Sequence, residues 1–207
     1  GVQGYLRVPF SFKETKVDSY ALSAHKIHGP KGVGALVLAD GARIKPIVAG
    51  GGQQGGLRSG TENTSGIAGM VAAVQSYPSD AMERMRGLKR LLLSLLTEAL
   101  PETTVAGLPV DDPMSAGHIL NVSFPPVRAE TLLHALEADG ICVGTGSACS
   151  SKKGRRSPVL TAMHLPPQVM DSAIRMSLCP FNTEEEMRYT AEKIIDRVGQ
   201  LRRFTRR

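Results

Sequence analysis

The sequence is poor in cysteine, in aromatic residues and in long apolar runs. Its 207 residues include three cysteines, no tryptophan and only 4% aromatic residues. An odd number of irregularly spaced cysteines argues against a disulfide framework and favours a reducing compartment, so we expect the cytoplasm. No apolar run reaches the roughly eighteen residues that a membrane-spanning helix needs, and no secretory pattern is visible near residue 1. We therefore expect no membrane association.

The positive charge of the chain is concentrated in two places. The formal net charge is +6, and the chain closes on Arg202, Arg203, Arg206 and Arg207, while a second basic cluster occupies residues 152–156. Few aromatic side chains interleave with these charges, so a surface on which nucleic-acid bases stack is not expected. We interpret the terminal arginines as a solvated tail. The remaining composition, with 42% hydrophobic residues and 22 glycines, is ordinary for an α/β protein.

A hydroxyl, an imidazole and an ammonium group lie together in the segment Ser23-Ala24-His25-Lys26. Residues 17–22 predict a strand before it, the glycines and proline of residues 29–34 predict a turn, and residues 33–38 predict a second strand. Polar groups at a strand end in an α/β chain lie where ligand crevices form, and a partly desolvated lysine attacks carbonyl groups more readily. An ordinary loop lysine beside a capping serine is the alternative.

The chain between residues 41 and 99 predicts a loop followed by two helices. Residues 41–60 are rich in glycine, which allows backbone amides to approach an anion closely, although a flexible linker is the alternative. Residues 61–64, Thr-Glu-Asn-Thr, supply N-cap residues for a helix that continues through Val74. Free amides at that N-terminus, with Thr61 beside them, suit a phosphate group. Residues 79–99 predict a long amphipathic helix whose apolar stripe packs in the core.

The C-terminal part of the chain alternates strands and helices. Thr183 and Glu186 predict a capping box for a final helix that ends near Phe204, and residues 144–157 predict a loop because they lack apolar periodicity. An α/β arrangement with helices on one side of a sheet fits this order. The predicted strands are residues 103–106, 119–124, 141–143 and 173–178, and the predicted helices are residues 128–138, 158–163 and 167–170.

Cys149 lies in this predicted loop, among the small residues of Gly146-Ser147-Ala148 and Ser150. Small neighbours leave a thiol exposed, and the basic residues that follow favour the thiolate. Cys142 and Cys179 lie within or beside strand-like runs, so we expect them to be buried and structural. No second cysteine or histidine lies at metal-ligand spacing from Cys149, and we expect no metal site.

Arg175 interrupts an apolar strand, between Ile174 and Met176. An arginine in such a place needs an anionic partner. A structural salt bridge and a bound anionic substrate both satisfy this requirement.

The sequence resembles the cysteine desulfurases of the class V aminotransferase family. Four blocks carry the resemblance in the family's order and cover nearly the whole chain: Ser-Ala-His-Lys at 23–26, Gly-Pro-Lys-Gly-Val-Gly at 29–34, the glycine-rich residues 50–61, and Gly-Ser-Ala-Cys-Ser at 146–150. The resemblance implies part of a pyridoxal-phosphate-dependent transferase of fold type I, the aspartate aminotransferase-like fold. Residues 1–78 would be the C-terminal part of its cofactor-binding large domain. Residues 79–207 would be a connecting helix and a smaller C-terminal α/β domain that carries the cysteine loop.

The resemblance also implies an activity, the conversion of L-cysteine to L-alanine with pyridoxal 5'-phosphate. Lys26 would hold the cofactor and move the proton from Cα, and Cys149 would take the sulfur as a protein persulfide. His25 is an alternative acid–base group because imidazole titrates near neutrality. The other implied contacts are Ser23, His25 and Thr61 to the phosphate, Gln3 to the phenolic oxygen and Arg175 to the substrate carboxylate, which suits a bidentate guanidinium.

The same resemblance implies two partners. The family's threonine at the position of Thr61 reaches the phosphate of the partner subunit, so a homodimer is expected. A sulfur acceptor, such as an iron–sulfur scaffold protein, would take the sulfur from Cys149.

Members of the family are longer than this chain. Gly1-Val2-Gln3 resembles the end of the family's Asp-Ala-Val-Gln segment, whose aspartate pairs with the cofactor's pyridine nitrogen. We therefore expect this chain to be a C-terminal portion that is inactive, or nearly so, alone. The alternatives are another enzyme of the family, a transaminase or selenocysteine lyase, or a non-catalytic half that serves as a dimerisation or scaffold-binding module.

Overall fold

The computed structural model describes residues 1–145 and 157–205. Contacts divide the chain into two compact units, Gly1–Ser79 and Asp80–Arg207. We call them the N-terminal unit and the C-terminal unit and describe each by itself. In the part of the chain that the structure describes, no helix is both long and apolar enough to span a membrane.

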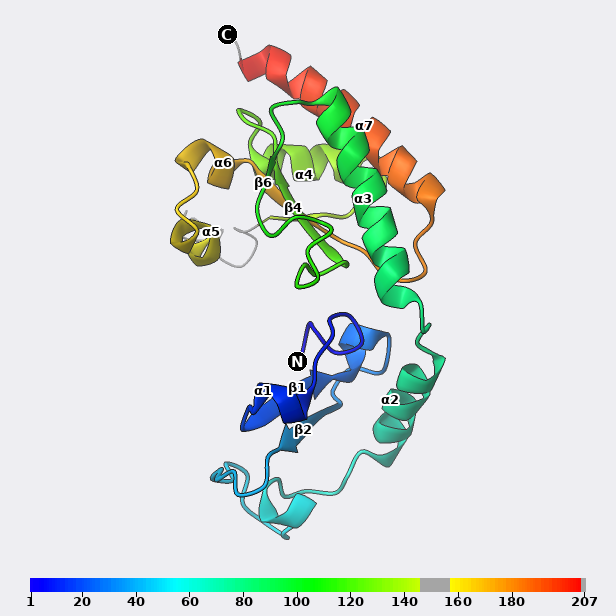
Figure 1. Ribbon diagram of the computed structural model, residues 1–207, viewed down its shortest axis with the longest axis vertical. Coiled ribbons are helices and arrows are strands. Elements are labelled where there is room, and N and C mark those ends of the chain that lie inside the picture. The colour runs from blue at the N-terminus through cyan, green and yellow to red at the C-terminus, as the bar shows by residue number, and fades with distance from the viewer. Residues whose placement is uncertain (146–156, 206–207) are drawn as a thin grey trace. The chain divides into compact units, whose positions relative to one another are not determined.

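A four-stranded antiparallel sheet organises the C-terminal unit (Figure 1). Its strands lie in the order β3 (Thr104–Val105), β4 (Ile119–Ser123), β6 (Ala173–Ser177) and β5 (Gly144–Thr145). In the register of this sheet, Asn121 of β4 and Gly144 of β5 lie on either side of Arg175. The predicted strands at residues 103–106, 119–124 and 173–178 are confirmed.

Alternation along the strands gives the sheet one apolar face. Leu120, Val122, Ile174 and Met176 point to that face, where they pack in one buried cluster with leucines and valines of three helices. Those helices are α3 (Ala81–Ala99), α4 (Ala129–Glu137) and α7 (Glu184–Thr205), and α3 lies alongside α7 (Figure 1). Because strand side chains alternate, the opposite face receives Asn121, Ser123 and Arg175.

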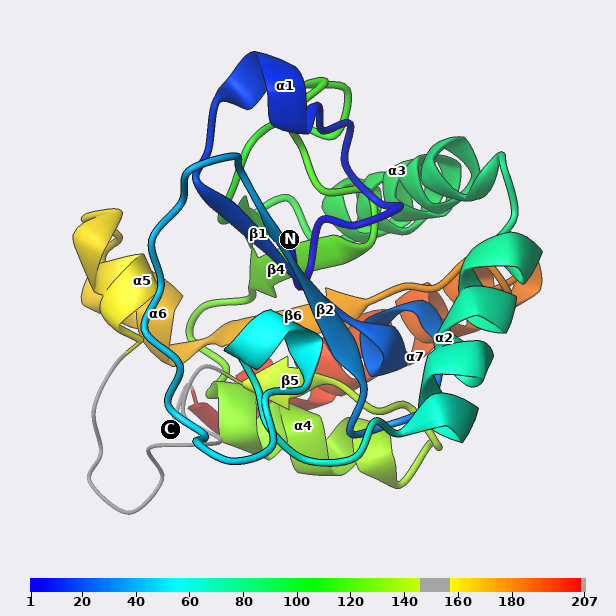
Figure 2. The same ribbon diagram turned by 90° about the horizontal axis from the view of Figure 1, so that it is seen from below.

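Two short helices precede β6 in the chain. Helices α5 (Pro158–Ala162) and α6 (Pro167–Asp171) lie together at one end of the sheet (Figure 2). A proline in the first turn begins each helix, where its missing amide costs no hydrogen bond. Both predicted helices are confirmed.

The predicted strand at residues 141–143 is wrong. These residues have no regular structure, and β5 begins one residue later, at Gly144. The amide of Ile141 still donates to the carbonyl of Leu136 (2.9 Å), and Gly140 adopts φ +75°. The chain is therefore closing the C-terminus of α4 where the apolar run suggested a strand.

The N-terminal unit contains a two-stranded antiparallel hairpin and one long helix. Strand β1 (Ser19–Ser23) pairs with β2 (Gly34–Leu38), and α2 (Thr64–Ser76) follows the glycine-rich loop. Both predicted strands and the predicted helix are confirmed. A short helix, α1 (Phe12–Thr15), was not predicted; the hydroxyl of Ser11 caps it by accepting from the Glu14 amide at 3.3 Å. Single 3₁₀ turns, η1 (Ala24–Ile27) and η2 (Gln54–Gly56), complete the unit.

The two units differ in how much apolar surface they bury. Among the described residues, the only fully buried apolar side chains of the N-terminal unit are those of Ala24 and Ile27. Leu36 and Val37 on β2 are 52% and 43% exposed. Among the described residues, the C-terminal unit has an extensive hydrophobic core, whereas the N-terminal unit buries few apolar side chains.

The capping box predicted for the last helix is confirmed. The amide of Glu186 donates to the hydroxyl of Thr183 (3.2 Å), and the carboxylate of Glu186 accepts from the Thr183 amide (2.9 Å). The side-chain amide of Asn182 donates to the same carboxylate at 2.9 Å. These hydrogen bonds, chiefly the one from Asn182, lower the pKa of Glu186.

We expect Glu186→Ala to lower the free energy of unfolding of the chain by about 1 kcal/mol, the usual contribution of a helix cap. Glu185→Ala is the matched control, since it removes the same charge from the same helical turn without breaking the cap. Urea denaturation at pH 7 measures both. Because the folded-state pKa of Glu186 is lowered, its contribution is present above its unfolded pKa and is lost as pH falls through the folded-state pKa. Equal losses in both variants at pH 7 would contradict this account of the cap.

Candidate cofactor site

Lys26 lies on the 3₁₀ turn that follows directly after β1. Ala24 and Ile27 are buried in this turn, with exposed fractions of 0% and 2%. His25 is exposed and Lys26 is half-buried. Among the described residues, no hydrogen bond or ion pair involves the Lys26 amine or the His25 imidazole. Burial of the first and last residues of the turn fixes it and leaves the two functional groups between them available.

Backbone hydrogen bonds close the turn around Lys26. The amide of Ala24 donates to the carbonyl of Val33 (3.0 Å), and the amide of Gly29 donates to the carbonyl of Ala24 (2.9 Å). His28 adopts a left-handed conformation with φ 66°, which reverses the chain immediately after the turn. The lysine is therefore presented by a closed loop whose geometry is set by the backbone.

This loop lies against the N-terminal half of α2 through residues without bulky side chains. A Cβ added to Gly66 would lie 2.4 Å from Cγ2 of Val33, and one added to Gly69 would lie 3.0 Å from Cγ of Pro30. A Cβ on Gly29 would meet the Ala24 carbonyl at 3.0 Å. The closeness of these contacts explains why glycine occupies positions of a helix that it otherwise destabilises.

Arg7 contacts the lysine turn from the N-terminal segment. Its guanidinium donates through Nη2 to the backbone carbonyl of Lys26 and through Nε to the hydroxyl of Tyr77 (3.4 Å). Neither residue was predicted from the sequence. No pattern pointed to them, because Arg7 lies in irregular chain and Tyr77 lies just after α2.

Gln3 lies in the same N-terminal segment, and its side chain is exposed. The segment runs beside β1, since a Cβ on Gly1 would lie 2.5 Å from the carbonyl oxygen of Ala21. Ser23, at the end of β1, is half-buried and its hydroxyl does not cap the turn that follows. Gln3 and Ser23 therefore both lie at the strand that carries the lysine turn.

The glycine-rich loop is held by its own hydrogen bonds. Ser59 is buried, its amide donates to the carbonyl of Val48 (3.3 Å), and its hydroxyl accepts from the Gly52 amide (3.4 Å). Arg58 donates to the carbonyl of Ser59 at 2.9 Å. These contacts order the loop through its backbone, and its left-handed glycines, such as Gly52 with φ 78°, allow the tight turns.

Thr61 lies between this loop and α2. The N-cap of α2 is Asn63, whose Oδ1 accepts from the Gly66 amide at 3.0 Å. The prediction that residues 61–64 supply the cap is confirmed, with Asn63 as the residue that forms it. Thr61 is exposed two positions before the cap, close to the positive end of the helix dipole.

Arg175 occupies the polar face of the sheet in the C-terminal unit. Its residue is exposed, and its guanidinium lies over Gly144, where a Cβ would come within 3.1 Å of Nη2. On β4, the strand on the other side of Arg175, the side-chain oxygen of Asn121 is buried without a hydrogen-bond partner among the described residues. Within residues 1–145 and 157–205, no carboxylate pairs with Arg175.

The predicted sulfur-carrying residue, Cys149, lies outside the described residues. The expectation that Cys142 is buried is wrong, because it is exposed; Cys179 is half-buried. Cys142 follows the end of α4 rather than lying within a strand, so no sheet neighbour covers it.

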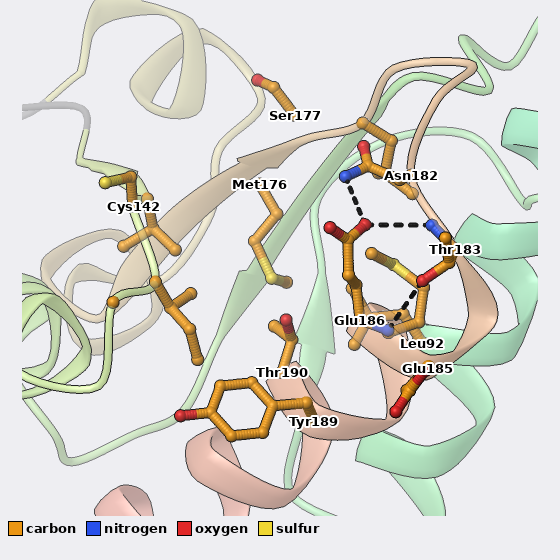
Figure 3. Close-up of a pocket in the computed structure, with 15 residues that line it drawn as sticks. Leu92, Cys142, Met176, Ser177, Asn182, Thr183, Glu185, Glu186, Tyr189 and Thr190 are labelled. Carbon is orange, nitrogen blue, oxygen red and sulfur yellow. Dashed lines mark hydrogen bonds between the residues drawn. The ribbon is translucent and has the colours of Figure 1, made fainter.

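Cys142 lines a cavity of about 510 Å³ in the C-terminal unit (Figure 3). Met176 lies between Cys142 on one side and Glu186 on the other (Figure 3). The Glu186 carboxylate is already engaged in the cap of α7. None of the predicted site residues lines this cavity, so the candidate site is the lysine turn.

The predicted site residues of the N-terminal unit fit pyridoxal phosphate by the chemistry of their donors. Lys26 offers an amine to an aldehyde, Ser23 and Thr61 offer hydroxyls to a phosphate, and Gln3 offers an amide to a phenolic oxygen. All belong to the N-terminal unit, and none of these side chains forms a hydrogen bond within the described residues. Arg175 belongs to the C-terminal unit.

Comparisons with known proteins point to one family. The family model described as aminotransferase class-V matches residues 1–189. A cysteine desulfurase 2 of Trichormus variabilis is 37% identical, with 97% of this chain matching 48% of that protein, and a cysteine desulfurase of Enterobacter agglomerans is 38% identical, with 97% matching 50%. A solved NifS-like protein is 39% identical with a TM-score of 0.82, and the match covers 97% of this chain and 52% of that one. The chain spans about half the length of the curated relatives it matches.

The packing of the lysine turn on α2 predicts opposite effects for two helical glycines. Gly66→Ala should destabilise the turn, because the methyl group would collide with Val33 and Asn63. Gly87→Ala in α3 is the matched control: nothing lies within 4 Å of the added methyl, so it should stabilise the chain by about 0.5–1 kcal/mol. Hydrogen exchange of the amides of residues 24–33 measures the turn, and urea denaturation measures stability. Unchanged exchange in Gly66→Ala would show that the contact with α2 does not hold the turn.

Proposed function

The chain belongs to the class-V aminotransferase family, whose members depend on pyridoxal phosphate, and from this premise we propose that it is the lysine- and cysteine-bearing part of a cysteine desulfurase. Its α/β fold is part of the fold type I architecture of the NifS-like proteins. One observation carries the proposal: Lys26 lies on a closed turn with its amine unengaged, in a chain that relatives named cysteine desulfurase match over 97% of its length.

We assign residues 1–78 to the cofactor-binding large domain and residues 79–207 to the smaller domain. The boundary between the two compact units, at Ser79 and Asp80, supports this assignment. The lysine turn and the glycine-rich loop then belong to the domain that binds the cofactor. Arg175 belongs to the domain that binds the substrate carboxylate and carries Cys149.

The cofactor supplies an aldehyde that binds amines and a conjugated ring that accepts electrons from Cα. With the cofactor bound, Lys26 would hold its aldehyde through Nζ and would carry the proton removed from Cα of L-cysteine. The hydroxyl of Ser23 and the imidazole of His25 would donate to the phosphate, and the hydroxyl of Thr61 would donate to the phosphate held by the partner subunit. Gln3 would donate its side-chain amide to the phenolic oxygen. His25 is the alternative acid–base group, and its exposed ring is accessible for that role.

Two residues act on the substrate. Arg175 holds the carboxylate of L-cysteine by a bidentate pair of hydrogen bonds. Its guanidinium is available for this contact because no carboxylate of the described residues pairs with it. The Cys149 thiolate attacks the substrate sulfur, so that an S–S bond forms as the C–S bond breaks. The products are L-alanine, whose Cβ takes up a proton and whose Cα regains the proton removed earlier, and a persulfide on Cys149. The reaction balances without an external oxidant.

We further propose a homodimer in the cytoplasm that passes its sulfur to an acceptor such as an iron–sulfur scaffold protein. The uncovered apolar side chains of the N-terminal unit, among them Leu36 and Val37, support the dimer, because a partner subunit would remove them from water. The family's use of the threonine at position 61 across the subunit interface points to the same assembly. A curated relative from Clostridium botulinum carries the name cysteine desulfurase IscS.

The function is tested by fixing the cofactor on its lysine. The protein is incubated with pyridoxal phosphate, reduced with borohydride and digested, and mass spectrometry reports which lysine carries the pyridoxyl group. We expect Lys26 to be labelled and Lys26→Ala to lose the label, whereas Lys31→Ala, which changes the neighbouring lysine, should keep it. With L-cysteine, in the full-length parent protein or in a complex with its other half, Cys149→Ala should retain labelling of Lys26 but lose persulfide and sulfide, and Cys142→Ala is its control.

Other outcomes identify the alternatives. Pyruvate instead of alanine and sulfide would indicate a transaminase. Alanine formed from selenocysteine but not from cysteine would indicate a selenocysteine lyase. No labelling of Lys26 at saturating cofactor would contradict the cofactor site and leave a non-catalytic interaction module.

The proposed dimer predicts a specific effect on α2. Ile67 and Val71 lie one helical turn apart and are 45% and 49% exposed. If a partner subunit covers them, Val71→Asn should raise the dimer dissociation constant by about a hundredfold, because each of the two subunits loses a buried valine that contributes about 1.5 kcal/mol. Sedimentation equilibrium measures it. Val159→Asn, at a 66% exposed position of the C-terminal unit, is the control, and equal affinities in the two variants would place the interface elsewhere.

A further inference from the structure

The carbonyl of Lys26 lies at the end of a single 3₁₀ turn. The last carbonyls of any helix lack intrahelical donors. After η1, the amides of His28 and Gly29 both donate to the carbonyl of Ala24. Within the described residues, no backbone amide donates a hydrogen bond to the Lys26 carbonyl. The peptide group that follows the lysine therefore depends on a donor from elsewhere.

Arg7 supplies that donor. Its Nη2 donates to the Lys26 carbonyl and its Nε donates to the hydroxyl of Tyr77 (3.4 Å). Arginine presents these donors in one rigid plane, so a single side chain links the lysine turn to the residue that ends α2. The ring of Tyr77 stacks near His28, with 6.5 Å between ring centroids, and this contact brings the same tyrosine to the residue that reverses the chain after the turn.

The backbone also holds Arg7 in place. The amides of Arg7 and Val8 both donate to the carbonyl of Gly4, at 2.9 and 2.8 Å. Leu6 adopts a left-handed conformation with φ 59°, which turns the chain just before Arg7. The arginine is half-buried. It is therefore presented by a tight turn of its own and is not a solvated surface cation.

We propose that Arg7 is a positioning residue for Lys26: by holding the lysine's backbone carbonyl against Tyr77, it fixes the peptide plane from which the reactive amine projects. Side-chain rotamers depend on the backbone conformation at their own residue. A fixed plane at Lys26 thus restricts the directions available to its ε-amine, and a lysine that must meet an aldehyde gains rate from that restriction. This inference rests on the proposed function, because it concerns the lysine assigned to the cofactor.

The test compares two lysines of the same protein. Purified chain is treated with pyridoxal phosphate and borohydride, and mass spectrometry gives the rate of pyridoxyl labelling at Lys26 relative to Lys31, an exposed lysine of the same loop. We expect Arg7→Met to lower this ratio by about tenfold, the scale of a misplaced reacting group. Arg7→Lys keeps the charge and one donor and should restore part of the ratio. Arg43→Met, at an exposed arginine of the same unit, should leave the ratio unchanged.

A second variant separates positioning from folding. Tyr77→Phe removes only the hydroxyl that Arg7 contacts and keeps the ring, so it should lower the labelling ratio by less than Arg7→Met while the urea midpoint stays that of the parent. A parental ratio in both Arg7→Met and Tyr77→Phe would overturn the role of Arg7 and leave the proposed function intact. In both variants, the labelling ratio could fall only as far as the urea midpoint falls. That result would be a general effect on folding and would likewise overturn the role of Arg7. Absence of labelling at Lys26 in the parent would overturn the proposed function, and the inference with it.

Discussion

The close approach of the lysine turn to α2 is the constraint on which the candidate site depends. Gly66 and Gly69 leave space on the helix for Val33 and Pro30, so the loop that carries Lys26 lies against a rigid element. Packing of this kind uses backbone and small side chains only. The functional groups of His25 and Lys26 are not consumed in holding the turn, and they remain available for chemistry. The glycine-rich loop is likewise held by its backbone and by the contacts of Ser59.

In the C-terminal unit, a sheet positions the functional side chain. Burying its apolar face against three helices contributes on the order of 25 cal/mol for each Å² removed from water, and the alternation of strand side chains then presents Arg175 on the other face. The arginine is placed by the burial of Ile174 and Met176 on either side of it. Because hydrophobic burial positions it, its charge needs no structural partner. Gly144 on the adjacent strand leaves room for the guanidinium.

Local patterns in the sequence predicted most of the elements, because periodicity and capping are local. The alternating strands, the stripe of α3 and the reciprocal cap of Thr183 and Glu186 are of this kind. The strand expected at residues 141–143 failed because an apolar triplet carries no period, and the C-terminal turn of α4 extended into it. Arg7 and Tyr77 were missed because Arg7 contacts Lys26 across nineteen positions and Tyr77 across seventy, and no local sequence pattern indicates such pairings.

The two units differ in how far their own cores can stabilise them. In the C-terminal unit, buried leucines, isoleucines and valines from every layer offset the entropy cost of ordering the chain, about 1–2 kcal/mol for each residue's backbone. In the N-terminal unit, Ile27 and Ala24 are the only fully buried apolar side chains among the described residues, and a two-stranded hairpin alone is marginal in water. The unit that carries the reactive lysine therefore gains most from any protein surface that covers β2 and α2. Assembly would stabilise the lysine turn first, since the turn packs directly on α2, so the capacity to hold a cofactor should rise with association even though the covered residues are not those that bind it.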